Sequence, residues 1–327
     1  MTVSKIGSTT STKQKVHLVL GSGGARGLAH IGVIRYLQDN GFEISEITGC
    51  SMGALIGGIY AAGKLDDYQN WVCSISRLEA LKFLDLSFSV KSGFVKGDRL
   101  MQQLGNWVGN SQIENLELPF TAVSADLKTQ SEVWINHGSL LEAIRASISV
   151  PGIFTPVSKH GKLLVDGGIL NPLPIPPKSL EKDQITIAVS LSGRAIKTPL
   201  GESQALADAV PDKSKEPNKE LNEIHGNQVK KAWDTLTALL ETQNKQPPEH
   251  DDSLSISEVL MSMFNTMQDT LTRYQIAGTP PDILIEIPSN ICNSHDFHRA
   301  NELIPAGEYW AKKAIEEQLS GRHPLKN

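Results

Sequence analysis

Short apolar runs alternate with glycine-rich turns and longer apolar segments over residues 16–63 of the chain. The run VHLVL has the length of a buried strand, and the apolar segment after the first turn has the length of a helix that ends at Gly41. The expected elements are strands at 16–20 and 43–48 and helices at 28–41 and 54–63. This alternation indicates α/β layers with a central, mostly parallel sheet and helices on both faces.

The same types of pattern continue through the rest of the chain, without an internal repeat. Residues 64–118 favour helices joined by loops, and Pro151 ends one later helix. The further elements expected are strands at 119–125, 131–135, 162–166, 185–192 and 282–288, and helices at 139–150 and 299–319. We therefore expect one domain over 16–317, with a disordered tail at 1–15 and a C-terminal tail at 318–327.

Residues 194–252 differ in composition from the rest of the domain. They are rich in Lys, Glu, Asp, Asn, Gln and Pro, which predicts a polar insertion with little core of its own, either a solvated linker or a lid or partner-binding element. An amphipathic stripe follows, formed by Ile256, Leu260, Met263, Phe264, Met267 and Leu271. Its ordinary interpretation is core packing, and the alternative is a methionine-rich wall for acyl chains.

Composition narrows the classes of partner and compartment. The net charge of −5 and the pI near 6.0 give no reason to expect nucleic acid as a partner. The three cysteines fit neither a zinc site nor a disulfide framework and suit a reducing compartment. The N-terminal residues lack the apolar run of a signal peptide, and we expect no transmembrane helix. The expected location is the cytoplasm, with export by a route that needs no signal left open.

The sequence Gly49-Cys50-Ser51-Met52-Gly53 has the pattern G-x-S-x-G. In this pattern a serine sits on a sharp turn between strand and helix, where its hydroxyl is exposed near the positive end of the helix dipole. The motif alone is weak, because a structural glycine turn can match it. Its position between a predicted strand and a predicted helix favours Ser51 as a nucleophile.

The earlier glycine-rich turn is a candidate oxyanion hole. Backbone N–H groups of Gly23 and Gly24 would lie beside the Ser51 turn in a parallel sheet. Arg26 could hold this loop, face an anionic head group or form a surface ion pair. As a dinucleotide cradle the loop is a poor match, because Arg26 stands where G-x-G-x-x-G needs glycine.

A nucleophilic serine also needs a general base. Asp166 ends a predicted strand and is followed by two glycines, a position where α/β active sites form, although Asp-Gly also starts ordinary turns. Burial would raise the pKa of this carboxyl toward the range of a useful base. Histidine is the more usual base, but none of the nine histidines lies in a recognisable motif.

Three blocks of sequence resemble the patatin-like phospholipases, in that family's order. They are Gly23-Gly24-Ala25-Arg26-Gly27, Gly49-Cys50-Ser51-Met52-Gly53 and Asp166-Gly167-Gly168. The segments 143–157, 165–174, 282–288 and 297–307 are also similar, so the resemblance covers roughly 16–193 and 254–317. The chain is most similar to the bacterial members related to neuropathy target esterase.

The resemblance implies a Ser–Asp dyad, with Ser51 as nucleophile and Asp166 as base. It implies oxyanion donors in the loop of Gly23 and Gly24, with help from the amides of Ala25 and Arg26. It implies no metal or organic cofactor, and a lipid ester substrate such as a phospholipid or lysophospholipid, which allows peripheral contact with a membrane. Cys50 departs from the threonine of many relatives, and its side chain need not enter the reaction.

Two other functions remain alternatives at this stage. One is an α/β-hydrolase esterase with a Ser–Asp–His triad, in which His295 or His298 serves as base. The other is a non-catalytic lipid- or nucleotide-binding module that keeps the glycine turns as scaffold. The sequence leaves the acyl chain length, the head group, the position cleaved and the oligomeric state open.

Overall fold

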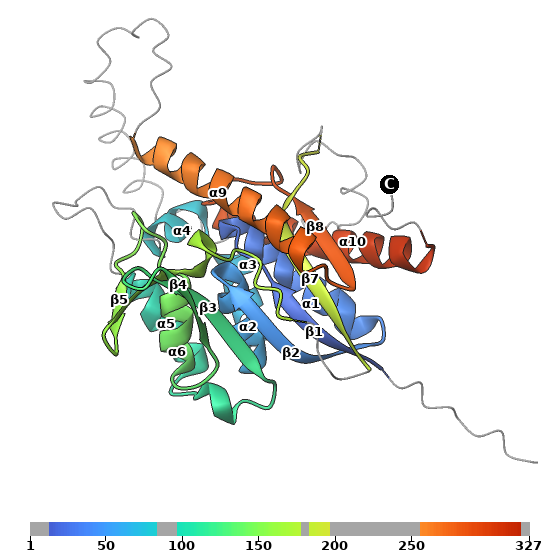
Figure 1. The fold of residues 1–327 in the computed structure, drawn as a ribbon, viewed down its shortest axis with the longest axis horizontal. Coiled ribbons are helices and arrows are strands. Elements are labelled where there is room, and N and C mark those ends of the chain that lie inside the picture. Colours follow the sequence, from blue (N-terminus) through green and yellow to red (C-terminus); the bar gives the residue numbers. More distant parts are fainter. Residues whose placement is uncertain (1–12, 84–96, 178–182, 197–255, 322–327) are drawn as a thin grey trace, which may run out of the picture.

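The computed structural model describes residues 13–83, 97–177, 183–196 and 256–321. The expected insertion therefore lies outside the described residues from 197 onward, and the expected N-terminal tail up to residue 12. Figure 1 shows the elements in chain order. The strands are β1 (Gln14–Leu20), β2 (Phe42–Cys50), β3 (Phe120–Asp126), β4 (Ser131–Ile135), β5 (Val157–Lys159), β6 (Lys162–Asp166), β7 (Gln184–Gly193) and β8 (Ile283–Pro288). The α-helices are α1 (Ala29–Asp39), α2 (Met52–Ala61), α3 (Leu65–Ser74), α4 (Arg77–Phe83), α5 (Asp98–Val108), α6 (Leu140–Ser147), α9 (Ile256–Gly278) and α10 (Ala300–Leu319). Short 3₁₀ helices are η1 (Gly24–Leu28), η2 (Ile113–Asn115), η3 (Gly167–Ile169) and η4 (Phe297–Arg299).

The strands form one eight-stranded mixed sheet. Its central order is β3-β2-β1-β7-β8, and these neighbours are all parallel. The strands β4, β5 and β6 add antiparallel pairings next to β3. The predicted class, a three-layer α/β fold with a mostly parallel sheet, is therefore confirmed.

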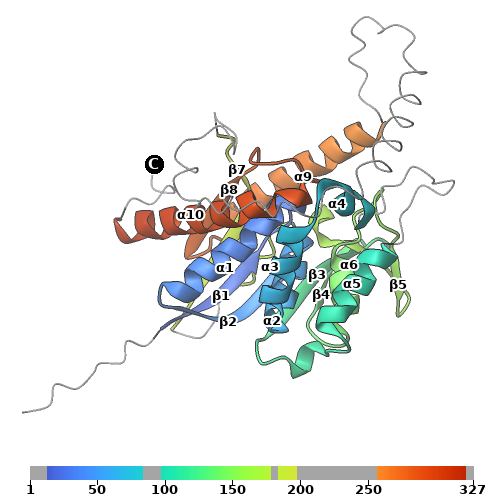
Figure 2. The same cartoon turned by 180° about the vertical axis from the view of Figure 1, so that it is seen from behind.

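Alternate side chains of the central strand β1 face the two helical layers. Leu18 and Leu20 are fully buried in the larger core together with residues of α1, α2 and α10. Figure 2 shows these helices on one face of the sheet. Val19 points to the other face, in a small cluster with Ala188 against which Ile276 of α9 packs (Figure 1). The period of two along this buried strand thus builds both cores.

Several expected boundaries and environments differ from the structure. β1 begins at Gln14, inside the expected tail, because its first residues pair with both β2 and β7. The amphipathic stripe is not core as a whole. Leu260, Met263 and Met267 are 56%, 62% and 40% exposed, whereas Ile276, nearer the C-terminus of α9, packs on the small cluster of Val19 and Ala188.

Candidate active site

Ser51 lies at the turn between β2 and α2 in a backbone conformation that non-glycine residues rarely adopt. Its φ is 55° and its ψ is −122°. The turn is tight, since a Cβ on Gly53 would lie 2.0 Å from the carbonyl oxygen of Leu20. The strained conformation directs Ser51 to the N-terminus of a buried ten-residue helix, as the G-x-S-x-G pattern predicts.

Ser147, at the end of α6, holds this turn from the side. Its hydroxyl accepts a hydrogen bond from the Ser51 amide at 3.0 Å and donates one to the Val123 carbonyl oxygen at 2.6 Å. Ser147 is fully buried, so it fixes the turn to β3 without contact with solvent. The sequence analysis did not single it out, and only its place between two apolar helical positions hinted at burial.

The register of β3 brings Asp166 next to this turn. Cys50, the last residue of β2, pairs with Val123, and Asp166, the last residue of β6, pairs with Ser124. β4 pairs with β3 along both stretches, so β2 and β6 must share the other edge. β2 runs parallel to β3 and β6 runs antiparallel, so the two strands meet end to end at neighbouring residues of β3.

This arrangement changes the reason for the position of Asp166. The sequence analysis relied on Asp166 ending a strand before two glycines, and the structure shows that this strand, β6, runs antiparallel to β3. Asp166 reaches the end of β2 because β6 arrives there from the opposite direction. Asp166 stays a predicted general base, and what the structure adds is the antiparallel direction of the strand that carries it.

Asp166 is fully buried, and burial raises the pKa of its carboxyl from 3.8 to about 6. Three weaker interactions oppose that shift, and the Ser51 hydroxyl comes first among them. The other two act on Oδ1, which accepts hydrogen bonds from the Gly168 amide at 2.7 Å and the Cys50 thiol at 3.8 Å. Oδ2 is buried without a well-formed hydrogen bond, so the contact with Ser51 falls short of full hydrogen-bond geometry. Cys50 therefore touches the candidate base directly, which the sequence analysis had not expected.

Gly23 and Gly24, in the glycine loop after β1, line the same cavity as Ser51. No described residue accepts a hydrogen bond from the amide of Gly23 or Gly24. Gly24 has a φ of +59°, and a Cβ there would lie 2.6 Å from the Ser294 carbonyl oxygen, so glycine is required. The Ala25 amide, by contrast, already donates to that oxygen at 2.9 Å. Gly23 and Gly24 are therefore the better oxyanion candidates in this loop.

Arg26 holds the loop through its side chain. Its guanidinium is buried and donates to the carbonyl oxygens of Gly23, Leu191 and Ser289 at 3.0 to 3.2 Å. It does not line the cavity beside Ser51. Of the roles considered for Arg26, the structure supports the anchor and not the contact with an anionic head group.

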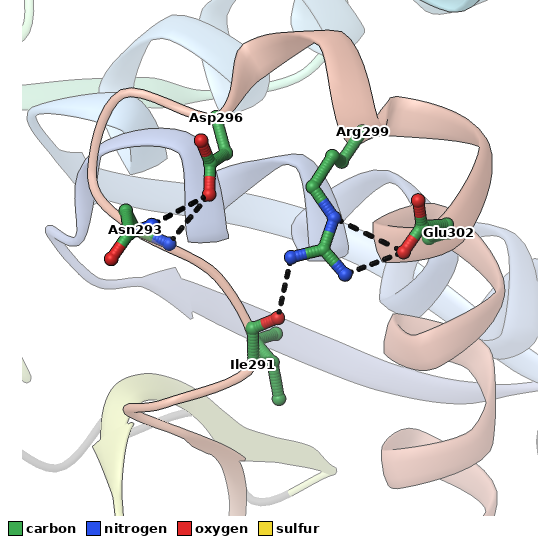
Figure 3. Close-up of polar contacts among 5 residues, drawn as sticks. All are labelled: Ile291, Asn293, Asp296, Arg299 and Glu302. Carbon is green, nitrogen blue, oxygen red and sulfur yellow. Dashed lines mark hydrogen bonds and ion pairs between the residues drawn. The ribbon is translucent and has the colours of Figure 1, made fainter. Parts of the chain in front are cut away.

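The segment between β8 and α10 contacts the glycine loop through the Ser294 carbonyl oxygen, and polar contacts within the segment are shown in Figure 3. Arg299 donates to the Ile291 carbonyl oxygen at 3.2 Å and forms an ion pair with Glu302. Asp296 accepts two hydrogen bonds from Asn293, at 2.9 and 3.1 Å. These contacts fix the segment that contains Ser294, whose carbonyl oxygen accepts the hydrogen bond from the Ala25 amide.

A cavity of about 440 Å³ opens in front of Ser51, Gly23 and Gly24. Most of its wall is apolar and comes from α2, α3, α9 and the segment 148–154 that follows α6. The apolar lining includes Leu55, Tyr68, Trp71, Val72, Ile148, Phe154, Leu260, Met261 and Phe264. Among the described residues, no Lys, Arg, Asp or Glu side chain lines this cavity. Leu260 and Phe264 belong to the amphipathic stripe, so part of that stripe is cavity wall.

The histidines differ sharply in their relation to the cavity. His30 is fully buried, its Nε2 lies 2.9 Å from the Gly21 carbonyl oxygen, and burial lowers its pKa to about 4. His295 lines the cavity and its side chain is 60% exposed, with Nε2 3.9 Å from Oδ1 of Asp296. His298 is not part of the lining. His295 is therefore the histidine that a test of the triad must address first.

No group of three or more His, Cys, Asp or Glu side chains in the described part of the chain could hold a metal ion. None of the helices in that part combines the length and apolar character needed to cross a membrane.

The fold and the site together define a three-layer α/β protein of the patatin type. The family model described as "Patatin-like phospholipase" matches residues 18–177. An uncharacterized NTE family protein of Mycobacterium tuberculosis is 34% identical over 94% of this chain and 92% of its own length. The chain therefore belongs to the patatin-like family related to NTE.

Two more distant similarities extend the comparison. Lysophospholipase NTE1 of Yarrowia lipolytica is 31% identical over 60% of this chain, which corresponds to 14% of that longer protein. Among solved structures, VipD from Legionella pneumophila overlaps 94% of this chain and 67% of its own, at 14% identity and a TM-score of 0.43. The last similarity is too low to carry an argument about function.

Proposed function

We propose that this protein is a serine acyl hydrolase that cleaves lipid carboxylic esters with Ser51 and Asp166. The observation that carries the proposal is the pairing of Cys50 and Asp166 with neighbouring residues of β3. That pairing sets a buried carboxylate against a serine in a strained turn at a helix N-terminus. Membership of the patatin-like family supports the same chemistry.

The proposed reaction has two steps. Asp166 accepts the Ser51 proton while Oγ attacks the ester carbonyl carbon, and the amides of Gly23 and Gly24 hydrogen-bond the developing oxyanion. When the tetrahedral intermediate collapses, the proton passes to the leaving alcohol and an acyl ester of Ser51 remains. A water molecule then gives a proton to Asp166 and attacks that ester. When this second intermediate collapses, Asp166 returns the proton to Ser51 Oγ, which releases the carboxylic acid and regenerates both groups.

The environment of Asp166 suits a general base. An ordinary aspartate is too weak a base, whereas a pKa of about 6 leaves Asp166 ionised at neutral pH and more basic than in solution. The base must be deprotonated, so activity should rise with pH through the acid range. The N-terminus of α2 favours the alkoxide character that develops on Ser51.

The cavity supports a lipid substrate, with a phospholipid or lysophospholipid as the preferred class. Its apolar wall suits an acyl chain, and a volume of about 440 Å³ suits one chain better than two. No described Lys or Arg side chain lines it to bind a phosphate, so the head group would remain outside. The named activity of the Yarrowia lipolytica relative is lysophospholipase, which supports the choice of substrate.

The test compares Ser51→Ala, Asp166→Asn, His295→Ala and His298→Ala on a short p-nitrophenyl ester and on lysophosphatidylcholine. We expect loss of at least about 10³-fold in kcat for the first two. The two histidine variants should stay within about threefold of the unmodified protein. Circular dichroism checks that each variant folds, and a fluorophosphonate probe should label every variant that retains Ser51 and an active base.

Each alternative function has its own outcome in this test. Severe loss in His295→Ala, with Asp166→Asn still active, would replace the dyad by a triad-type mechanism. A folded protein without Ser51-dependent hydrolysis or labelling would favour a binding module.

A further inference from the structure

Gln268 is a polar side chain of α9 that lies against the catalytic loops. It is 4% exposed and lines the same cavity as Ser51 and Gly23. Its Nε2 donates a hydrogen bond to Oγ of Ser22 at 2.9 Å, one residue before Gly23. The sequence analysis assigned no role to Gln268, which lies between Met267 and Leu271 of the apolar stripe.

The same carboxamide also reaches the turn that carries Asp166. A Cβ on Gly168 would lie 2.1 Å from Nε2 of Gln268, 3.1 Å from Oγ of Ser22 and 3.0 Å from Oδ1 of Asp166. Three polar groups therefore converge on the space that glycine leaves open at this position. The Gly168 amide meanwhile donates to Oδ1 of Asp166 at 2.7 Å, so the turn and the carboxylate move together.

Packing alone does not explain a glutamine at this position. Among the described side chains of α9, from 259 to 278, only Gln268 and Thr272 are buried, and Met263 and Met267 are exposed. A buried carboxamide costs free energy unless it is hydrogen-bonded, and leucine would fill the same space without that cost. The partner that satisfies Gln268 is Ser22, at the base of the glycine loop.

We propose that Gln268 is a positioning residue that fixes the Gly23 and Gly24 amides relative to the turn of Asp166. This inference rests on the proposed function and deepens it, because it assigns α9 a part in the catalytic geometry. Gln268 does not take part in proton transfer. It contacts Ser22, next to the oxyanion donors, and Gly168, in the turn of the base, and so keeps the distance between donors and base constant.

The test uses Gln268→Leu, Ser22→Ala, the double variant and Thr272→Val in the full chain. Thr272→Val is the matched control, because Thr272 is buried one helical turn away and does not line the cavity. On a p-nitrophenyl ester, Gln268→Leu and Ser22→Ala should each lower kcat by roughly 10- to 100-fold, since small misplacements of catalytic groups are costly. KM should stay within about threefold, and the control should keep kcat within about twofold.

The kcat of the double variant should lie within about threefold of the kcat of the less active single variant. Both substitutions remove the same hydrogen bond, so their effects should not multiply. Multiplicative losses, or a kcat for Gln268→Leu within about threefold of the unmodified protein, would overturn the inference. A loss confined to KM would also overturn it, since it would indicate a role in binding the chain of the substrate.

A second measurement keeps this test separate from the test of the proposed function. Amide hydrogen exchange in residues 21–27 should be faster in Gln268→Leu and Ser22→Ala than in Thr272→Val. Unchanged exchange would refute the positioning role even if the protein had no esterase activity. If hydrolysis did not depend on Ser51 but exchange in residues 21–27 was faster in these variants, the proposed function would be refuted. The role of Gln268 in holding the glycine loop would still be supported.

Discussion

Replacement of Asp166 by asparagine should stabilise the protein at neutral and alkaline pH while it abolishes hydrolysis. Burial raises the pKa of this carboxyl to about 6, so folding opposes its ionisation. Asparagine has nearly the same shape and never ionises. Its Oδ1 can still accept the hydrogen bond from the Gly168 amide.

The sign and the size of the effect follow from linkage. Below the unfolded pKa of 3.8 the carboxyl is protonated in both states, and the native protein has its full stability from this group. As the pH rises through about 6 the native carboxyl must ionise, and that stability is lost. The rise from 3.8 to about 6 corresponds to about 3 kcal/mol in the free energy of unfolding. At pH 8, Asp166→Asn should therefore be more stable by that amount, roughly 5–10 °C in Tm.

Urea denaturation of both proteins at pH 4 and pH 8 measures this difference. The two free energies of unfolding should nearly coincide at pH 4 and differ by about 3 kcal/mol at pH 8. His17 and His30 are buried with their pKa values lowered to about 4, so acid also destabilises the fold through them. That effect is common to both proteins and cancels in the comparison. A difference independent of pH, or a less stable Asp166→Asn at pH 8, would refute the reasoning.

Two further predictions concern the turn around the nucleophile. The Cys50 thiol donates a hydrogen bond to Asp166, and this bond lowers the pKa of Asp166. Cys50→Ala removes the bond, so the acid limb of the kcat/KM profile should move to higher pH. An unchanged profile would show that the thiol has no influence. Gly53→Ala should cost about 3 kcal/mol or prevent folding, because its Cβ would lie 2.0 Å from the Leu20 carbonyl oxygen. Gly105→Ala, in α5, is the control, because its Cβ would lie an ordinary 3.6 Å from the side chain of Leu141. Urea denaturation should show this variant to be as stable as the unmodified protein or about 0.5–1 kcal/mol more stable. Similar stability of the two alanine variants would show that the turn tolerates a side chain.

Local patterns in the sequence were enough to predict most of the elements. Apolar runs and the glycines and prolines that end them gave the central strands and the flanking helices, because these signals depend on near neighbours only. The three-residue strand β5 was missed, since so short a segment has no detectable period. The apolar stripe of α9 was assigned mainly to the core, because periodicity cannot tell a cavity wall or an exposed face from a packed one.

For the candidate site, too, some features followed from local sequence and others from the tertiary structure. By itself the sequence determined that Ser51 sits on a glycine-flanked turn, that glycines follow β1 and that Asp166 precedes two more. Only the tertiary structure decided that β6 runs against β3 and stops beside the end of β2, which sets Asp166 next to the Ser51 turn. It also decided the roles of Ser147 and Gln268, whose partners are 96 and 246 residues away in the chain. Contacts at such separations depend on strand register and helix placement, and no local pattern of residues records either.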